Sequence, residues 1–525
     1  MIKFIKRLSV FLVLTLMITM FTANFSLPKA NAAFGDRITV SGTQFMAGGQ
    51  RISINGANTP WDNWDDFGGN YDANWWTSHF QQLHDNGVNA VRVWITCSGD
   101  TGINISTDGT VSGATSQHWS DLDSFFSIAQ SKGIYIMATL ISFDAFKNTY
   151  TNYQKWRNMI ANDTKIDSYV NNYVKPFVDR YKNNPYLWSI DLMNEPDWVY
   201  EDAACGNISW DRMQTYFAKA AVAIHANSSI LVNVGIAMSK YNSDTCSGAV
   251  GNKVSNAALQ AKVNDSRAKV DFYSPHYYDW MGAYWGVPFY ESTLAFGLET
   301  SKPAIVGECP ANGTTGHTLT QDYESGYNYG WQGAMAWSSN GVDSQGGFDQ
   351  LTPATRAFRD NHYSLVFPGG GGTSPYALCE DSLNSDWENW SWNGTINFST
   401  TSPVYSGSYS VSNNFTSAWA GFALHKKSGS IQTSAYNKIT FYMHGGTVAN
   451  QALSLYLHNG EQACAEVNIN SYIEGGSLAA GTWRKVTVPL SALGAANISL
   501  TRFTIQDTLG AAQPIFYIDK IMLEP

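Results

Sequence analysis

The sequence predicts an α/β fold of the (β/α)8 barrel type, followed by an all-β jelly-roll sandwich domain. Across residues 34–367, eight short apolar runs alternate with longer amphipathic segments. Residues 368–375 then read PGGGGTSP, and residues 376–525 contain short alternating segments with no long helical pattern. Strands that alternate with helices predict parallel βα units, and eight such units close a barrel. Evenly spaced short strands predict a sandwich.

The predicted barrel strands are short and apolar, as expected for strands that are buried on both faces. They begin at Ile52, Ala90, Ile134, Leu187, Ile230, Asp271, Ala304 and Gly333. Between them, segments such as WWTSHFQQLHDNG and SDLDSFFSIAQSKG have the spacing of amphipathic helices. Asn86-Gly87 and Lys132-Gly133 are typical helix stops.

The two regions are joined by residues 368–375, where proline flanks four glycines. This composition predicts a flexible linker. Residues 376–525 then supply segments such as KITFYMHGG, LSLYLHN and LTRFTIQD, in which apolar residues alternate with polar ones. The alternation predicts strands that are buried on one face only.

The chain begins with a segment typical of exported proteins. Lys3, Lys6 and Arg7 precede an apolar run from Leu8 to Phe21, and residues 30–32 read Ala-Asn-Ala. This arrangement predicts a secretory signal peptide over residues 1–32, because the run is short for a membrane span. We expect a secreted, extracellular protein with no membrane attachment after cleavage; a single-span anchor is the weaker interpretation.

Charge and aromatic content limit the partners. The formal charge is −10, which disfavours nucleic acid as a partner because phosphates require basic residues. Charged and aromatic residues each make up 14% of the chain. This balance suits a neutral, hydroxyl-rich partner held by aromatic rings, although large aromatic cores would produce it too. A monomer is expected.

The six cysteines indicate a structural role rather than a metal site. No CxxC motif occurs, which disfavours zinc and thioredoxin-type chemistry. Export permits disulfides, and Cys205 with Cys246 and Cys379 with Cys464 are the candidate pairs. The connectivity stays open.

Chemically active side chains gather at the ends of the predicted barrel strands, which in such a barrel meet at one face. The fourth strand ends at Glu195 and the seventh at Glu308. The other strand-end residues are Arg92, Trp94, Asn194, His276, Tyr277, Tyr278 and Trp337. We therefore expect the two glutamates to meet across the mouth of the barrel. A glutamate considered alone would more often be a capping or salt-bridge residue.

Two opposed carboxyl groups are what cleavage of a glycosidic bond requires. One protonates the leaving oxygen and the other attacks the anomeric carbon, and a separation of roughly 5–5.5 Å marks retaining chemistry. We predict Glu195 as the proton donor and Glu308 as the nucleophile, because Arg92 and Tyr278 are expected to hold Glu308 as an anion with a low pKa. Asn194 would bind the sugar 2-hydroxyl.

These motifs resemble glycoside hydrolase family 5, a family of retaining (β/α)8-barrel glycosidases that includes cellulases and mannanases. The resemblance runs from about Ile38 to Phe367 and is carried by VRVW, MNEP, PHYY, VGE and AWS. It implies acid/base Glu195 and nucleophile Glu308. It further implies supporting roles for Arg92, Asn194, His276 and Tyr278, and it places Trp337 under the sugar of the central subsite.

One departure from the family pattern concerns the third predicted strand. Many family members, typical cellulases among them, carry a histidine at its end, whereas this chain has Thr139, Ser142 and Asp144 in MATLISFDAF. Mannan-cleaving members often lack that histidine too. The departure favours β-1,4-mannan over cellulose, and the choice stays open.

Tryptophans in the loops after the strands predict further sugar contacts. They are Trp61, Trp64, Trp198, Trp280 and Trp285. An indole face can stack on the C–H face of a sugar, and several such rings at one barrel face suggest an open cleft with subsites along a polymer. Structural packing is the alternative for each ring taken singly.

The C-terminal region resembles a carbohydrate-binding module of the β-sandwich type. Its candidate glycan-binding rings are Trp387, Trp390, Trp392 and Trp419, with core packing as the alternative. Glu380, Asp381 and Asp519 form a candidate site for structural calcium, because calcium prefers hard oxygen ligands.

The sequence thus predicts a secreted retaining endo-β-1,4-glycanase acting on plant polysaccharide, either mannan and glucomannan or cellulose and β-glucan. Retaining hydrolysis by two glutamates requires no metal or organic cofactor, and none is expected in the barrel. The alternatives are a non-catalytic glycan-binding protein and a transglycosylase on the same barrel.

Overall fold

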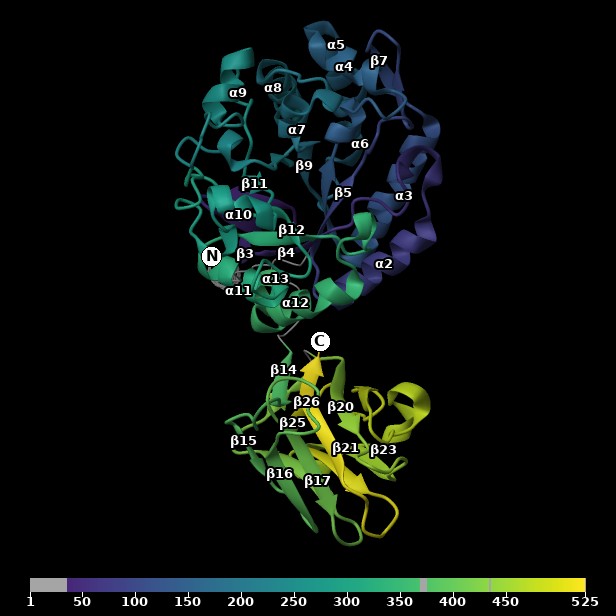
Figure 1. The fold of residues 1–525 in the computed structure, drawn as a ribbon. Helices are drawn as coiled ribbons and strands as arrows, with labels where there is room; N and C mark the ends of the chain where they lie inside the picture. The colour runs from purple at the N-terminus through teal and green to yellow at the C-terminus, as the bar shows by residue number, and fades with distance from the viewer. Residues whose placement is uncertain (1–34, 369–374, 434–435, 525) are drawn as a thin grey trace, which may run out of the picture.

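The computed structural model describes residues 35–368, 375–433 and 436–524, which form a parallel α/β barrel and a β-sandwich (Figure 1). The predicted signal peptide and residues 369–374 of the linker lie outside the described residues. Among the described residues, no helix has the length and apolar character needed to span a bilayer.

Eight parallel strands make the barrel, as predicted. In hydrogen-bonding order they are β11 (Ser274–Pro275), β10 (Leu231–Ile236), β9 (Leu187–Asn194), β8 (Tyr135–Thr139), β5 (Ala90–Trp94), β4 (Ile54–Asn58), β13 (Gly333–Trp337) and β12 (Val306–Pro310). Parallel bridges between Tyr273 and Ala304 and between His276 and Glu308 join the two end strands. The barrel is therefore closed between β11 and β12, where His276 and Glu308 lie side by side.

Helices surround the strands (Figure 1). The longer ones are α2 (Ala73–Asp85), α3 (Ser116–Lys132), α8 (Trp210–Asn227), α9 (Asn256–Val263), α11 (Leu319–Asn328) and α12 (Phe348–Asn361). The predicted stop at Gly133 is confirmed, because this residue ends α3 in a left-handed conformation with φ of 70°. Helix α11 begins with a capping box between Thr318 and Gln321.

Shorter helices lie in the connections between the strands and at the end of the barrel domain. They include α4 (Tyr153–Ala161), α5 (Asp163–Tyr169), α6 (Lys175–Tyr181), α7 (Pro196–Glu201), α10 (Asp279–Trp285) and α13 (Tyr363–Val366). A small hairpin of β6 (Ile103–Ile105) and β7 (Val111–Ala114) follows β5. Helices α7 and α10 directly follow β9 and β11, so their first residues border the strand ends.

An antiparallel sheet that the sequence patterns did not reveal packs against one end of the barrel. It contains β1 (Ile38–Ser41), β2 (Gln44–Ala47) and β3 (Gln50–Ile52). Phe45 of this sheet makes edge contacts with Trp188 and Phe272, which stack on each other at 5.1 Å. Trp188 lies near the start of β9, so the sheet covers the end opposite to Glu195.

The C-terminal domain is a sandwich of two antiparallel sheets, as predicted. The first sheet runs β16 (Gly394–Thr400), β17 (Ser410–Phe415), β26 (Phe516–Glu524), β20 (Lys438–His444) and β24 (Trp483–Pro489), with β14 (Tyr376–Cys379) paired to β26. The second sheet runs β15 (Trp387–Asn389), β18 (Gly421–Lys426), β25 (Ser499–Asp507), β21 (Leu453–Asn459) and β22 (Gln462–Ala463). Short strands β19 (Ile431–Gln432) and β23 (Val467–Asn468) border the second sheet. Phe441 and Phe503 meet edge to face between the sheets at 5.8 Å.

The predicted disulfides are wrong, because all six cysteines are free in the described structure. Cys379 belongs to β14 of the first sheet, whereas Cys464 follows β22 at the edge of the second. Cys205 is buried in the barrel core, and Cys246 lies partly exposed against Gly297.

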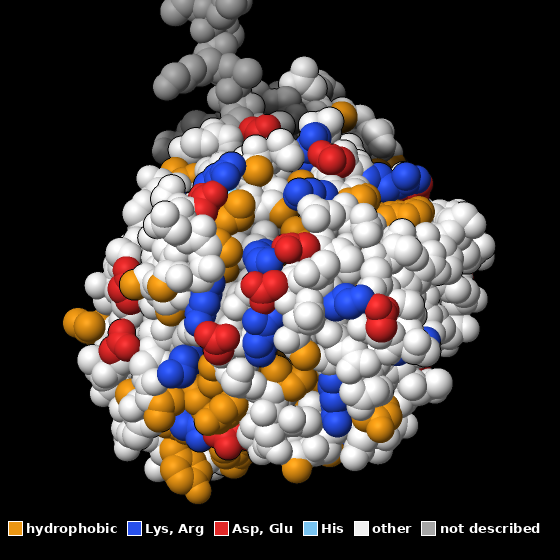
Figure 2. Space-filling view, turned by 90° about the horizontal axis from the view of Figure 1, so that it is seen from above, with side chains coloured by type: hydrophobic (Ala, Val, Ile, Leu, Met, Phe, Trp, Pro, Cys, Tyr) orange, Lys and Arg blue, Asp and Glu red, His pale blue; other side chains and the backbone are white. Residues whose placement is uncertain are grey.

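Charges of both signs are intermixed on the face shown in Figure 2, with no large patch of one sign. Ion pairs such as Lys219 with Asp167 and Lys262 with Asp211 connect the surface helices. Exposed pairs of this kind contribute little to stability, typically about 0–1 kcal/mol.

Candidate active site

Glu195 lies where β9 turns into α7. Its backbone is left-handed, with φ of 48°, and its N–H donates a 2.9 Å hydrogen bond to the Gly235 carbonyl of β10. Pro196 begins the helix, a position at which its missing N–H costs nothing. A non-glycine residue in this conformation requires support from its surroundings and is common at functional sites. The turn brings the Glu195 side chain to the mouth of the barrel.

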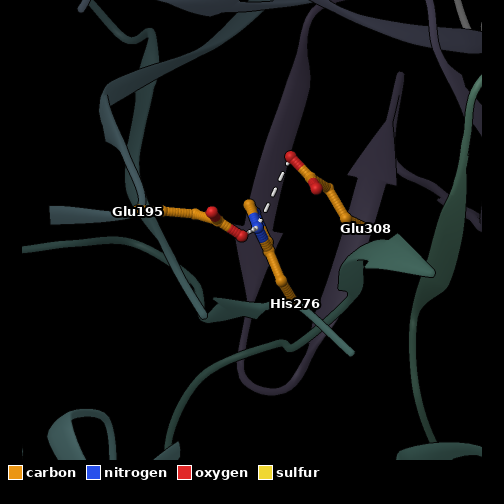
Figure 3. Close-up of side chains that lie close together, drawn as sticks. All are labelled: Glu195, His276 and Glu308. Carbon is orange, nitrogen blue, oxygen red and sulfur yellow. Dashed lines mark hydrogen bonds and ion pairs between the residues drawn. The ribbon is translucent and has the colours of Figure 1, made fainter. Parts of the chain in front are cut away.

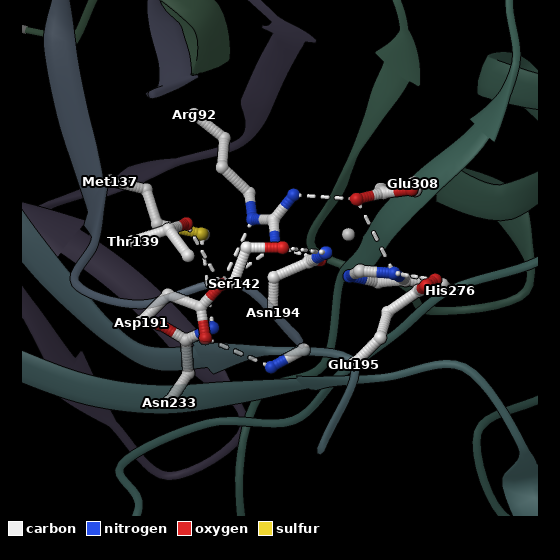
Figure 4. Close-up of polar contacts among 12 residues, drawn as sticks. Arg92, Met137, Thr139, Ser142, Asp191, Asn194, Glu195, Asn233, His276 and Glu308 are labelled. Atoms are coloured by element: carbon white, nitrogen blue, oxygen red, sulfur yellow. Dashed lines mark hydrogen bonds and ion pairs between the residues drawn. The ribbon is translucent and has the colours of Figure 1, made fainter. Parts of the chain in front are cut away.

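Glu308 lies on β12 and is only 4% exposed. Its Oε1 accepts a 2.6 Å hydrogen bond from Arg92 (Figure 4). Its Oε2 accepts a 2.8 Å hydrogen bond from the Tyr278 hydroxyl. Each carboxylate oxygen therefore has a donor, and one of the two donors is a permanent cation. This environment suits an oriented anion.

His276 lies between the two glutamates (Figure 3). Its Nδ1 is 2.8 Å from Oε1 of Glu195 and 3.4 Å from Oε1 of Glu308. One ligand-type atom from each of the three residues lies within 4.8 Å of the other two. The carboxyl groups thus approach closely enough for a covalent sugar intermediate, because inverting enzymes require a gap of about 6.5–9.5 Å for a water molecule.

Arg92 is held by a network that fills the barrel below the glutamates (Figure 4). Asp191 accepts hydrogen bonds from its Nε and Nη2 at 3.0 and 2.8 Å, and Asn194 accepts one at 2.7 Å. Asn58, which the sequence patterns did not single out, accepts a further one at 3.1 Å. Asp191 is therefore a buried partner that positions Arg92.

Burial shifts the pKa of each central group. It raises the pKa of Glu195 to about 7, although Arg92 and a hydrogen bond with Trp198 oppose the shift. Burial also raises the pKa of Glu308, against the opposing effects of His276 and Arg92. Desolvation lowers the pKa of His276 to about 4, so this imidazole is neutral near pH 7. The expectation of a low pKa for Glu308 is thus wrong in direction, because desolvation outweighs the neighbouring cation.

The segment after β8 replaces the histidine that many family members carry. Thr139 donates a 3.0 Å hydrogen bond to Asp191, and Asn194 donates a 3.4 Å one to the hydroxyl of Ser142. Ser142 in turn donates to Asp144 at 2.8 Å. Asp144 is buried, and desolvation raises its pKa to about 6. These residues extend the polar network from Arg92 through Asn194 to a further acid.

A cluster of tryptophans adjoins the Glu308 side of the site. Trp61, Trp94 and Trp337 pack together, and Trp64 and Tyr278 contact this cluster. The ring of Trp337 is 6.1 Å from Trp61 and 5.6 Å from Trp94. Because Tyr278 also contacts Glu308, the structure brings the predicted residues Trp61, Trp64 and Trp337 together beside the glutamates.

The sequence patterns missed one aromatic ring next to Trp64, that of Tyr150. Tyr150 stacks on Trp64 with ring centroids 5.6 Å apart and planes 12° apart. Tyr150 lies in a long loop with no motif of its own. Its position therefore became apparent only from the fold.

The remaining loop tryptophans divide into two places. Trp198 is partly buried in α7, three residues after Glu195. Trp280 and Trp285 both belong to α10, where Trp280 is 48% exposed and Trp285 is partly buried. With Tyr284, they form an aromatic patch on α10, in the loop that follows β11.

The module tryptophans are separated by the sandwich. Trp387 is 1% exposed in the core and donates a 3.1 Å hydrogen bond to the Tyr376 hydroxyl, so the prediction that it contacts glycan is wrong. Trp390 and Trp419 are 44% and 58% exposed, and Trp392 is partly exposed. The latter three rings remain available to a ligand.

Two sets of side chains are candidates for binding a metal ion. Glu195, His276 and Glu308 are the one set in the described ranges whose ligand-type atoms lie close enough to share an ion. Glu380, Asp381 and Asp519 border a common pocket, but no such close set includes them. Asp519 instead accepts hydrogen bonds from the backbone of Tyr405 and Ser406. The calcium site stays a prediction.

Known proteins share both the sequence and the fold of the barrel. Residues 45–344 match the profile of the cellulase family, glycosyl hydrolase family 5. The mannan endo-1,4-beta-mannosidase of Cryptopygus antarcticus is 25% identical over 344 residues, covering 59% of this chain and 87% of that protein. That of Mytilus edulis is 26% identical over 342 residues, covering 58% and 89%.

Solved structures agree with this assignment. The beta-1,4-mannanase from Aplysia kurodai is 25% identical, with a TM-score of 0.56 over 63% of this chain and 99% of that one. The endo-1,4-beta-mannanase from Eisenia fetida, at 23% identity, shares the fold with a TM-score of 0.55 over 62% and 95% of the two chains. Because the family profile spans more than half of the chain, the protein belongs to the cellulase family, glycosyl hydrolase family 5, and is an O-glycosyl hydrolase.

Proposed function

We propose that this protein is a secreted endo-β-1,4-mannanase that hydrolyses mannan or glucomannan with retention of the anomeric configuration. The observation that carries the proposal is the close approach of Glu195 and Glu308, whose oxygens lie within 4.8 Å of each other. Burial raises the pKa of both carboxyl groups, that of Glu195 to about 7. Only Glu308 accepts hydrogen bonds from both Arg92 and Tyr278, which favours Glu308 as the anion.

In the first step, ionised Glu308 attacks the anomeric carbon and forms a glycosyl-enzyme ester. Protonated Glu195 donates its proton to the leaving glycosidic oxygen, so the alcohol departs neutral. In the second step, Glu195 accepts a proton from water as the water attacks the same carbon, and Glu308 is released as a carboxylate. Two inversions at one carbon restore its configuration. No metal or organic cofactor takes part in this scheme.

Asn194 is suited to bind the sugar 2-hydroxyl. Its Oδ1 accepts a hydrogen bond from Arg92, which leaves its Nδ2 directed toward Ser142 at 3.4 Å. A sugar hydroxyl next to the amide could replace this long contact with a shorter one. Trp337, at the end of β13 and in the cluster that Tyr278 contacts, provides an apolar surface for the same sugar ring.

The preference for mannan rests on two observations. The relatives named above are mannan endo-1,4-beta-mannosidases. In addition, Thr139, Ser142 and Asp144 stand where many family members place a histidine. Endo action is supported by the aromatic rings on two sides of the glutamates, Trp61 with Trp64 and Trp280 with Trp285. We further propose that the sandwich holds the enzyme on polysaccharide, which raises its effective concentration there.

Reducing-sugar release from mannan, glucomannan, carboxymethyl cellulose and barley β-glucan tests the substrate. We expect the two mannose-containing polymers to be cleaved fastest, and faster cleavage of carboxymethyl cellulose would overturn the mannan assignment. NMR of the first product formed tests retention, since an inverting enzyme releases the α-anomer. Product analysis with an added acceptor sugar distinguishes hydrolysis from transglycosylation.

A further inference from the structure

The outer surface of the second sandwich sheet has side chains in cross-strand rows. Register places Glu388, His425, Arg502 and His458 in one row, Ala423, Thr504 and Tyr456 in the next, and Gly421, Gln506 and Ser454 in a third. Leu424, Phe503 and Leu457, which alternate with these positions, are buried in the sandwich core. Because side chains alternate along a strand, all three rows point away from the core.

Trp390 and Trp392 join this surface beyond the end of β15. The Trp390 N–H donates to the Ala423 carbonyl at 2.9 Å, and Trp392 forms a bridge with Gly421. Residues two apart on an extended chain share a face, and their β18 neighbours Ala423 and Gly421 are small. A Cβ atom at Gly421 would be 2.4 Å from the Trp392 ring. The Trp392 ring therefore occupies the space where a side chain at position 421 would lie.

The Trp390 ring lies flat on the side chain of His425 in the neighbouring strand β18. Its ring is stacked on His425 at 3.5 Å with an interplanar angle of 6°, and the Arg502 guanidinium lies 4.8 Å from its centroid. The ring is nevertheless 44% exposed. One face is thus supported by the sheet, and the other is open to solvent as an apolar platform. Such support reduces the conformational entropy that the ring would lose on binding a ligand.

Polar atoms without partners lie next to these platforms. Ser454 Oγ, His458 Nδ1 and Arg502 Nε form no hydrogen bond, although Ser454 and His458 are only 2% and 7% exposed. Buried polar atoms normally have partners, and an unpaired one is costly. Gln506, in contrast, connects the Tyr456 hydroxyl to the Trp419 carbonyl. Unpaired donors and acceptors beside an apolar ring suit a ligand rich in hydroxyl groups.

The charges on this surface are balanced. Arg502 pairs with Glu461 at 3.2 Å, and His425 pairs with Glu388 at 3.2 Å. Burial lowers the pKa of His458, which favours its neutral form. An anionic polysaccharide would require cations that are not already paired. The surface therefore favours an uncharged ligand over one that contains uronic acids.

We propose that this surface binds a neutral β-1,4-linked hexopyranose chain, with Trp390 and Trp392 stacked on sugar rings and Arg502, His458 and Ser454 hydrogen-bonding to sugar hydroxyls. The inference rests on the proposed function, to which it adds the face and the polar residues of the binding site. Trp392 stacks only because position 421 is glycine. The geometry thus makes Gly421 a determinant of binding although its own side chain is a single hydrogen.

Affinity electrophoresis of the full chain through gels containing glucomannan tests the proposal. A parent protein carrying Glu308→Gln and Trp337→Ala prevents cleavage and weakens binding in the barrel, so retardation reports the sandwich. We expect Trp390→Ala and Gly421→Val each to weaken binding by about tenfold or more, as loss of a central stacking contact does. Tyr409→Ala, a 40% exposed ring next to β17 of the other sheet, is the matched control and leaves retardation unchanged.

Several outcomes would overturn the proposal. The first is that glucomannan does not retard the parent protein. The second is that Trp390→Ala migrates like the parent. The third is that polygalacturonate retards the parent more than glucomannan does. Thermal unfolding shows whether Gly421→Val is folded, and Trp390→Ala, which removes an exposed ring, provides a second variant. Hydrolysis of glucomannan by the native chain is measured separately. If the native chain does not hydrolyse glucomannan but the parent is retarded as expected, the proposed function is contradicted and this inference stands.

Discussion

The Tyr278 hydroxyl donates a 2.8 Å hydrogen bond to Oε2 of Glu308, the oxygen that Arg92 does not contact. A hydrogen bond to an ionised carboxylate lowers its pKa, and Tyr278 has this effect on Glu308. Tyr278→Phe removes only the hydroxyl. We therefore expect the acidic limb of the kcat/KM profile, which reports the ionisation of the free enzyme's nucleophile, to move to higher pH by roughly 0.5–1 unit.

The expected loss of activity for Tyr278→Phe is larger at low pH than at high pH. Tyr277→Phe is the matched control, because that neighbouring hydroxyl has no contact with either glutamate in the described structure. An acidic limb that stays in place while kcat/KM falls equally at all pH values would show that the Tyr278 hydroxyl does not set the pKa of Glu308.

Glu195→Gln and Glu308→Gln are expected to differ in their dependence on the leaving group. Loss of a general acid costs about 10²–10⁴-fold when the departing oxygen requires a proton. With a dinitrophenyl glycoside, whose leaving group needs no proton, Glu195→Gln should still form the glycosyl-enzyme and release a burst of dinitrophenol. Glu308→Gln should lose activity on both substrates because it lacks the nucleophile.

Stopped-flow absorbance measures the burst, and mass spectrometry of the quenched protein detects the added sugar. The two substitutions are isosteric, so each serves as the control for the other. If Glu308→Gln forms the adduct and Glu195→Gln does not, the two roles are exchanged.

Asp144 raises the pKa of Glu195 through its negative charge, together with Asp191 and against Arg92 and Trp198. Asp144→Asn removes that charge and retains an acceptor for Ser142. The pKa of Glu195, about 7 in the native protein, should then fall. Because the general acid must be protonated, the alkaline limb of kcat/KM should move to lower pH, by up to roughly 1 unit.

The matched control for Asp144→Asn is Asp85→Asn, at the end of α2, where the side chain is 61% exposed. It should leave the profile unchanged. An alkaline limb that moves to higher pH in Asp144→Asn would mean that this acid acts on Glu195 through something other than its charge.

Most of the barrel could be predicted because each strand is a short apolar run bounded by helix signals. The sixth strand, β11, has only the two residues Ser274–Pro275, yet His276 beside it was still assigned to the right face. The β1–β3 sheet could not be predicted, because three strands of three or four residues leave no periodic pattern. The network around Arg92 also could not be predicted, since Asn58 joins it only when β4 and β5 pair.

The spacing of the module tryptophans predicts which of them share a face. In an extended segment, residues three apart face opposite sides and residues two apart face the same side. Trp387 and Trp390 therefore had to separate, and Trp390 and Trp392 had to stay together. The sequence alone could not tell which side is the core. Likewise, the direction of the Glu308 pKa shift depends on how deeply the fold buries it, which no motif reports.

Asp197 is predicted to make stability fall as pH rises. It is fully buried at the start of α7, and burial raises its pKa from 3.8 to about 8, with a further contribution from Glu195. A carboxyl group whose pKa is higher in the folded than in the unfolded state favours folding while protonated. Its contribution is complete below about pH 4 and is lost progressively as pH rises through about 8. Asp197→Asn cannot titrate and should lose this dependence.

Thermal unfolding of the two proteins at pH 5 and pH 8 measures the effect. We expect the Tm of Asp197→Asn, relative to that of the native protein, to be higher at pH 8 than at pH 5 by roughly 2–4 °C. The Asn side chain retains an oxygen that can accept from the Met238 or Ala237 backbone, so the helix start keeps part of its hydrogen bonding. Glu195→Gln removes the neighbouring negative charge and therefore tests the coupling between Glu195 and Asp197.

 The negative charge of Glu195 raises the pKa of Asp197. Glu195→Gln should therefore shift the pH dependence of stability to lower pH. Equal Tm differences at pH 5 and pH 8 for Asp197→Asn would show that Asp197 does not titrate between the folded and unfolded states in this range.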